Sequence, residues 1–134
     1  MPKTTFEIST RQRCELVDLT RKVQEQVSAA GVASGLVTVY CPHTTAAITI
    51  NENADPDVRR DLLFALERSV PNEGFLHGEG NSDSHTKASL VGPSVTVIVE
   101  DGQLQLGTWQ SIFFCEFDGP RRRNVWVQTI AERG

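Results

Sequence analysis

All three histidines of the 134-residue chain fall within about one third of its length. His43 follows Cys41-Pro42, and His77 and His85 enclose a segment (78–84) rich in Gly, Asn, Asp and Ser. Neutral imidazole is a common ligand for zinc, copper, iron and nickel, and it changes charge near neutral pH. The cluster therefore predicts a metal site or an acid–base site. The alternative is that each histidine is an ordinary hydrogen-bonded residue of a loop or the core.

A metal site built from His43, His77 and His85 would leave one position open for water or substrate. That composition is typical of catalytic zinc sites. The spacing of 34 and then 8 residues matches no local zinc motif. Imidazole ligands favour a zinc-like divalent metal over magnesium, which prefers oxygen ligands. The sequence leaves open whether these histidines bind metal, bind substrate by hydrogen bonds or act as a general base.

Acidic and polar residues of the chain supply further candidates for the site. Glu52, Glu116 and Asp118 are candidate catalytic residues, either as a general base or as partners that orient an imidazole, with an ordinary surface acid as the alternative for each. Cations, hydroxyls and amides are suited to holding a phosphate and its substrate. The predicted substrate-binding residues are Thr44, Thr45, Asn53, Asn81, Lys87, Gln110 and Arg121.

Helix signals in the sequence predict three helices. Apolar residues recur near helical spacing from Leu19 to Ala30, before a stop at Gly31. Asp55-Pro56 combines an N-cap acceptor with proline at the first helical position and predicts a second helix that ends near Pro71. A short third helix is predicted through Leu90, with His85 in its first turn.

Strand signals account for most of the remaining chain. Alternation at Phe6 and Ile8 predicts a strand whose hairpin partner is Cys14–Val17. Further strands are predicted over 36–40, 46–50, 95–99, 109–118 and 125–130, and Asp101-Gly102 is a strong two-residue hairpin signal. The whole chain (1–134) is therefore expected to be a single α+β domain. Its fold class would be a mainly antiparallel β-sheet sandwich with two main helices and a short third.

The amino-acid composition limits the classes of protein to which this chain can belong. Three cysteines without Cys-x-x-Cys spacing fit a reducing compartment, and no apolar window approaches the length of a membrane span. We therefore expect a cytoplasmic protein without a membrane partner. A net charge of −4 with mixed signs argues against a nucleic-acid partner. The block Arg121-Arg122-Arg123 is interpreted as a solvated turn between strands, with a local anion site as the alternative.

Three segments of the chain resemble the YjbQ family, also called the secondary thiamine-phosphate synthase enzyme family. The first joins Cys41-Pro42-His43-Thr44-Thr45-Ala46-Ala47 to Asn51-Glu52-Asn53-Ala54-Asp55-Pro56, the second runs from His77 through His85 to Lys87, and the third runs from Leu106-Gly107-Thr108-Trp109-Gln110 to Phe117-Asp118-Gly119-Pro120-Arg121. The resemblance implies a compact α+β homotrimer with sites near subunit boundaries. It also implies a weak thiamine-phosphate synthase activity, in which a pyrimidine pyrophosphate joins a thiazole phosphate and pyrophosphate departs.

The residues and the resemblance together predict a metal-assisted enzyme that acts on a small phosphorylated metabolite. Pyrophosphate chemistry usually employs magnesium, whereas imidazoles prefer zinc-like metals, so a metal-assisted hydrolysis stays open beside the transferase reaction. The alternative function is a non-catalytic homotrimeric module that binds a metal or a small molecule.

Overall fold

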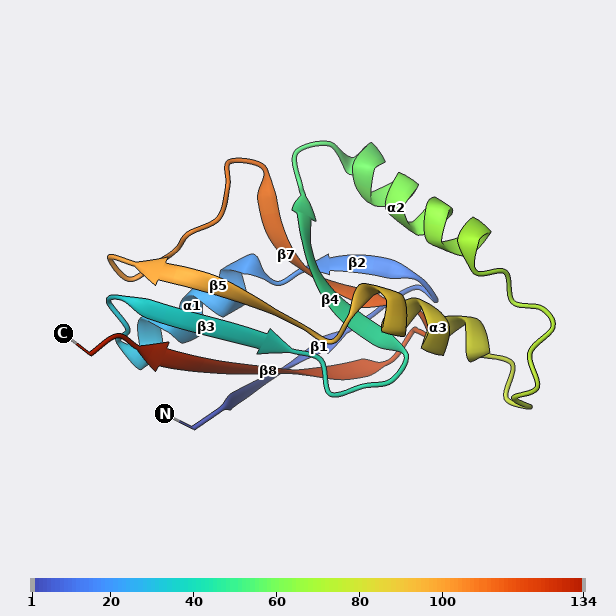
Figure 1. The fold of residues 1–134 in the computed structure, drawn as a ribbon, viewed down its shortest axis with the longest axis horizontal. Coiled ribbons are helices and arrows are strands. Elements are labelled where there is room, and N and C mark those ends of the chain that lie inside the picture. Colours follow the sequence, from blue (N-terminus) through green and yellow to red (C-terminus); the bar gives the residue numbers. More distant parts are fainter. Residues whose placement is uncertain (1, 134) are drawn as a thin grey trace.

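The computed structural model describes residues 2–133, which form two antiparallel sheets and three helices (Figure 1). In chain order the elements are β1 (Thr4–Ser9), β2 (Glu15–Asp18), α1 (Thr20–Ala30), β3 (Gly35–Tyr40), β4 (Ala46–Glu52), α2 (Pro56–Ser69), α3 (Ser82–Val91), β5 (Ser94–Glu100), β6 (Gln103–Leu104), β7 (Gln110–Glu116) and β8 (Arg122–Ala131). The prediction of an α+β fold with antiparallel sheets, two main helices and a shorter third is confirmed.

Local sequence signals start and stop several elements where they were predicted. The Asp55 carboxylate accepts a hydrogen bond of 2.9 Å from the Asp57 amide and caps α2, with Pro56 at the first helical position. Gly31 ends α1 with a left-handed φ of 69°. Asp101 and Gly102 also have positive φ, at 51° and 72°, as a tight turn between β5 and β6 requires.

The larger sheet has the strand order β1-β8-β3-β5-β6, and the smaller has the order β2-β7-β4. Their facing sides enclose the main core together with one side of α1. Val39 and Val127 of the larger sheet, Phe114 and Ile48 of the smaller, and Val23 of α1 all belong to this core. Each such side chain contributes about 1.5–3 kcal/mol through burial. The molecule is therefore a sandwich whose two sheets are held together by apolar packing.

A second apolar cluster lies on the outer side of the smaller sheet, which α2 and α3 cover (Figure 1). Cys115 and Phe117 pack there with Ala88 of α3, and Leu63 and Leu66 of α2 contribute partly buried side chains. Strand β7 is consequently buried on both faces over its last six residues, 111–116. The smaller sheet is thus the central layer between the larger sheet and two helices.

The predicted hairpin between Phe6–Ile8 and Cys14–Val17 is wrong. β1 pairs with β8 and β2 pairs with β7, so the connection 10–14 passes from one sheet to the other. This connection lies against the β7–β8 turn, because the Thr10 amide donates to the Arg121 carbonyl at 2.9 Å and the Gly119 amide donates to the Arg13 carbonyl at 3.0 Å. Two loops that are distant in sequence are thereby joined at one end of the sandwich.

Within residues 2–133, no helix combines the length and the apolar character needed to cross a membrane.

Candidate functional site

A buried ion pair stands at the end of the sandwich where the 10–14 connection meets the β7–β8 turn. Glu116 is fully buried and Arg123 is 3% exposed. The Arg123 guanidinium donates to both oxygens of Glu116, with its Nε at 2.9 Å from Oε1, and to the Thr45 hydroxyl at 2.8 Å. Glu116 also accepts from the Thr10 hydroxyl at 2.7 Å and from the Asp118 amide at 3.1 Å. The ion pair thus ties three segments: Glu116 binds the loop after β1 and the turn after β7, and Arg123 binds Thr45, the residue before β4.

The electrostatics of Glu116 follow from these contacts. Burial raises the pKa of the carboxyl, but the hydrogen bonds from Arg123, Thr10 and the Asp118 amide outweigh burial and hold that pKa below its ordinary value. Both carboxylate oxygens of Glu116 accept hydrogen bonds within the protein, and neither is accessible to a ligand. The geometry therefore favours a positioning role for Glu116 over the role of general base.

A second ion cluster fastens α3 to the same loop. The Arg13 guanidinium donates to both oxygens of Asp83, at 3.0 and 3.2 Å, and the Lys87 ammonium lies 3.4 Å from the same carboxylate. Burial opposes ionisation of Asp83, but the Arg13 hydrogen bonds and nearby charges prevail and lower its pKa. Lys87 is only 2% exposed. The Lys87 ammonium therefore anchors the helix. Because it is buried, this ammonium is badly placed for the phosphate-binding role expected from the sequence.

Asn81 and Asp118 connect the histidine loop to the β7–β8 turn. The Asn81 amide donates to Asp118 Oδ2 at 2.8 Å, and Arg121 donates to the same oxygen at 3.1 Å and to the Asp118 carbonyl at 2.9 Å. Asn81 precedes α3 but makes no side-chain capping bond to it. Among the described residues, Asn81 Oδ1 is the buried side-chain nitrogen or oxygen that has no hydrogen-bond partner.

His77 and His85 lie together beside this connection. Their ring centroids are 5.5 Å apart with the planes at 75°. His77 Nδ1 is 3.1 Å from the Ser82 hydroxyl, and its Nε2 is 3.7 Å from Glu79 Oε1. Since the His77 side chain is 40% exposed, a solute can reach the pair. The structure thus brings together two of the three predicted metal ligands.

His43 makes a different contact. Its Nε2 accepts a hydrogen bond of 2.9 Å from the Asn124 amide, which occupies the lone pair that would bind a metal. Burial and the nearby positive charge of Arg123 lower the pKa of His43. Within residues 2–133, no group of three or more His, Cys, Asp and Glu side chains is arranged to hold a metal ion. One chain therefore does not form the three-histidine site, which stays a prediction.

Three of the predicted site residues lie at the opposite end of the smaller sheet. Glu52 pairs with Gln110 in the β4–β7 register, six residues away from the pair formed by Ala46 and Glu116. Six residues of strand span roughly 20 Å. Asn53 donates to Asp18 at 2.8 Å, and the Gln110 side chain accepts from the Gly107 amide at 2.8 Å. Glu52, Asn53 and Gln110 are thus not brought together with the histidines.

Thr10, Arg13, Asp83 and Arg123 organise the site but were not predicted as site residues. The interpretation of Arg121–Arg123 as a solvated turn is wrong for Arg123, which is buried in β8. The sequence did contain a signal for the burial of Arg123, because residues 123, 125, 127 and 129 share one face of a strand. Arg121 and Arg122 are exposed, as that interpretation expects.

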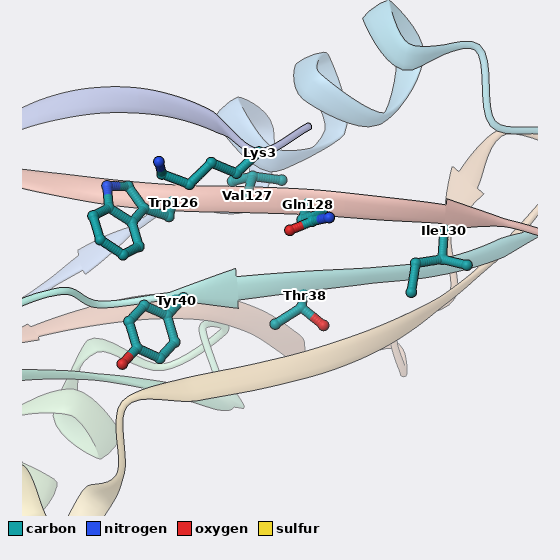
Figure 2. Close-up of a pocket in the computed structure, with 7 residues that line it drawn as sticks. All are labelled: Lys3, Thr38, Tyr40, Trp126, Val127, Gln128 and Ile130. Carbon is teal, nitrogen blue, oxygen red and sulfur yellow. The ribbon is translucent and has the colours of Figure 1, made fainter. Parts of the chain in front are cut away.

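The outer face of the larger sheet bears a hollow of about 450 Å³ (Figure 2). Tyr40 and Trp126 are stacked there with centroids 5.7 Å apart, and the Lys3 ammonium lies 4.7 Å from the Trp126 ring. Its lining consists of Lys3, Thr38, Tyr40, Trp126, Val127, Gln128 and Ile130. None of the candidate site residues lines it, so this face is a separate feature of the surface.

Comparison with known proteins identifies the family. Residues 4–132 match the model of the family described as UPF0047 protein YjbQ-like. The chain belongs to the YjbQ family. It is 52% identical to UPF0047 protein YugU of Bacillus subtilis over 128 residues, which cover 94% of this chain and 97% of that protein. A UPF0047 protein of Methanocaldococcus jannaschii is also 52% identical, over 96% of this chain and 94% of its own length.

Solved structures of YjbQ relatives show the same fold. A family member from Clostridium acetobutylicum, described as an orthologue of YugU, superposes with a TM-score of 0.93 at 51% identity, covering 95% of this chain and 99% of that one. A hypothetical protein from Aeropyrum pernix also reaches a TM-score of 0.93 at 37% identity, covering 98% of this chain and 100% of its own. These comparisons establish the YjbQ family and its fold.

Removing the Glu116 carboxylate should strongly destabilise the fold. We expect Glu116→Ala to lower the free energy of unfolding by about 3–5 kcal/mol, because it leaves Arg123 buried without a counter-charge. Arg122→Ala is the matched control, since Arg122 is exposed and lies 3.9 Å from Glu7; its effect should stay within about 0.5 kcal/mol. Urea denaturation of both variants measures the difference, and equal effects would contradict the role given to the pair.

Stability should fall as the pH drops below about 6.5, the ordinary pKa of histidine. Because the pKa of His43 is lowered in the folded chain, the unfolded chain takes up the proton first, and stability present above pH 6.5 is lost toward the folded pKa. His43→Gln should flatten this dependence in unfolding measurements kept above pH 5, while His85→Gln, the control, should retain it. An unchanged slope in His43→Gln would refute the assignment.

Proposed function

We propose that this protein is an enzyme that acts on a phosphorylated small molecule at a surface formed by His77, Asn81, His85, Asp118 and Arg121, called here the α3-end site. The observation that carries the proposal is the hydrogen-bonded chain from Arg121 through Asp118 to Asn81. It holds a half-exposed guanidinium next to the histidine loop and the first turn of α3.

Phosphate recognition is supported by the donors at this surface. The first N–H groups of a helix lack intrahelical acceptors, and the helix dipole favours an anion beside them. In α3 the Ser84 and His85 amides donate to the Asn81 carbonyl, and the Asn81 side chain makes no capping bond to the amides before them, those of Ser82 and Asp83. Arg121 keeps half of its side chain exposed and adds a planar set of donors suited to phosphate oxygens.

Two reaction types are compatible with these groups. In a transfer that releases pyrophosphate, the type implied by the family resemblance, catalysis consists mainly of stabilising charge on the departing group, which Arg121 and the α3 amides would do. In a hydrolysis, His77 or His85 would act as the general base for water. A zinc-like ion would take these two imidazoles as ligands, with its other ligands supplied from outside the pair.

Loss of Arg121 should weaken binding of inorganic pyrophosphate. We expect Arg121→Ala to raise the dissociation constant about tenfold or more, as removal of a charge-assisted contact of about 1.5–3 kcal/mol requires. Arg122→Ala, which removes the neighbouring exposed cation, should leave the constant within twofold. Isothermal titration calorimetry provides the measurement. No pyrophosphate binding to the unaltered protein, or equal losses in both variants, would overturn the phosphate site.

Turnover separates an enzyme from a binding module. A thermal-shift screen of phosphorylated metabolites would identify ligands, and product formation would then be assayed with the unaltered protein and with His77→Ala. The proposal expects turnover that His77→Ala abolishes while the fold is retained. Binding without turnover would support the alternative of a non-catalytic homotrimeric module that binds a metal or a small molecule.

We also infer that the protein is a cytoplasmic homotrimer. Cytoplasmic location is supported by Cys14, Cys41 and Cys115, which are all free thiols. Assembly is supported by the outer face of the larger sheet, where Leu36, Ile98 and Ile130 lie side by side with exposed fractions of 43%, 56% and 66%. An apolar row of this kind is typical of interaction surfaces.

A lysine in this apolar row should break the assembly. We expect light scattering to give the mass of three chains for the unaltered protein and a lower mass for Ile98→Lys, because assembly would bury the new charge. Leu76→Lys is the control, since Leu76 is an equally apolar and fully exposed residue away from the sheet. A trimer that persists in Ile98→Lys would place the interface elsewhere.

A further inference from the structure

We propose that Ser82 is a nucleophile, activated by His77, that forms a covalent phosphoserine intermediate during hydrolysis of a phosphate monoester. This inference rests on the proposed function and narrows it, because it selects hydrolysis and names the attacking group. The observation behind it is an ordered contact of three groups: the Ser82 hydroxyl 3.1 Å from His77 Nδ1, and His77 Nε2 3.7 Å from the Glu79 carboxylate.

These three groups fill the roles of nucleophile, base and orienting acid. A serine hydroxyl is a weak nucleophile until a base within hydrogen-bond reach removes its proton. His77 Nδ1 is within that reach, and the carboxylate of Glu79 lies 3.7 Å from the other ring nitrogen, where its charge would favour the imidazolium that forms. The His85 ring lies beside the His77 ring, with the ring planes at 75°.

Ser82 is also held on a rigid element. It is the first residue of α3, and its carbonyl accepts a hydrogen bond of 2.9 Å from the Thr86 hydroxyl. The helix is fastened to the sandwich through the Arg13–Asp83 ion pair. The Ser82 and Asp83 amides, which receive no side-chain cap at the start of α3, would stabilise negative charge that develops on a phosphoryl group under attack.

The other serines of α3 differ from Ser82 in their partners. Ser84 is fully buried and donates to the Phe117 carbonyl at 2.6 Å, so its hydroxyl has a structural role. Ser89 is exposed and donates to the His85 carbonyl at 3.0 Å. Within α3, the contact between a serine hydroxyl and an imidazole thus belongs to Ser82, and Ser89 provides a natural control.

The proposed hydrolysis of the phosphate monoester takes place in two steps. First, Ser82 Oγ attacks phosphorus and forms the Oγ–P bond, while the P–O bond to the alcohol breaks and the alcohol oxygen leaves with the electron pair. The serine proton passes to His77 Nδ1 and then to the departing oxygen. Second, water attacks the phosphoserine, its proton passes to His77 and then to Ser82 Oγ, and inorganic phosphate leaves. The sum is phosphate monoester plus water giving alcohol plus phosphate.

A fluorophosphonate probe tests the nucleophile directly on the full chain. Attack by Ser82 Oγ would form an Oγ–P bond and expel fluoride, with the serine proton taken by His77, and peptide mass spectrometry would locate the adduct. We expect one adduct, on Ser82. Labelling should be abolished in Ser82→Ala, slowed about 100-fold in His77→Gln, where the general base is lost, and unchanged in Ser89→Ala. Circular dichroism would establish that each variant is folded.

Two outcomes would overturn the proposal: no adduct on Ser82 in the folded protein, or an equal labelling rate in His77→Gln. Pyrophosphate binding measured on the same samples separates this failure from that of the proposed function. Binding without labelling would reject Ser82 as the nucleophile and leave the phosphate site standing, whereas loss of both would reject the two together.

Discussion

The buried pair of Glu116 and Arg123 is the interaction on which the arrangement of the candidate site depends. Taking two charges out of water costs several kcal/mol per ion, and their attraction offsets that cost only when the remaining hydrogen-bonding capacity is also satisfied. Here both oxygens of Glu116 are occupied, by Arg123, Thr10 and the Asp118 amide. Because these donors come from three separate parts of the chain, the pair specifies how the loops meet.

The contacts then extend outward from the core to the surface in steps. The Asp118 amide bonds to Glu116, and the Asp118 carboxylate bonds to Asn81 and Arg121. On the other side, Arg13 bonds to Asp83 in the first turn of α3. The helix that carries Ser82 and His85 is therefore positioned by charges that lie beneath it. Such support allows exposed residues to keep a defined geometry.

Features set by neighbouring residues could be predicted from the sequence. Asp55-Pro56, Gly31 and Asp101-Gly102 act through their own backbone and capping preferences, so the starts and stops that they indicate hold in the structure. Pairing between distant strands depends on the whole fold. The sequence therefore suggested a hairpin of β1 with β2, whereas β1 lies beside β8. The same limit explains why the sequence did not separate Glu52 from Glu116. The two acids lie at opposite ends of the smaller sheet.

Among the sequence signals, clusters of charged residues and of histidines were the least informative about which side chains form the site. Arg123 has the composition of a solvated turn around it, and only its alternation with the buried valines of β8 indicates an inward side chain. The clustering of histidines in sequence predicted one site, and the structure pairs His77 with His85 but gives His43 a backbone partner. Burial and partner identity, which determine what each side chain does, depend on segments far apart in the chain.

Hydrogen exchange of Glu116→Gln, followed by mass spectrometry under conditions where the variant is folded, tests the central claim most directly. The substitution keeps the shape of the side chain and removes its charge. If the pair holds the loops together, exchange should quicken jointly in residues 10–13, 43–45, 81–84 and 118–121, while the strands of the larger sheet stay protected. Faster exchange confined to residues 116–123, with the other loops unchanged, would contradict the account.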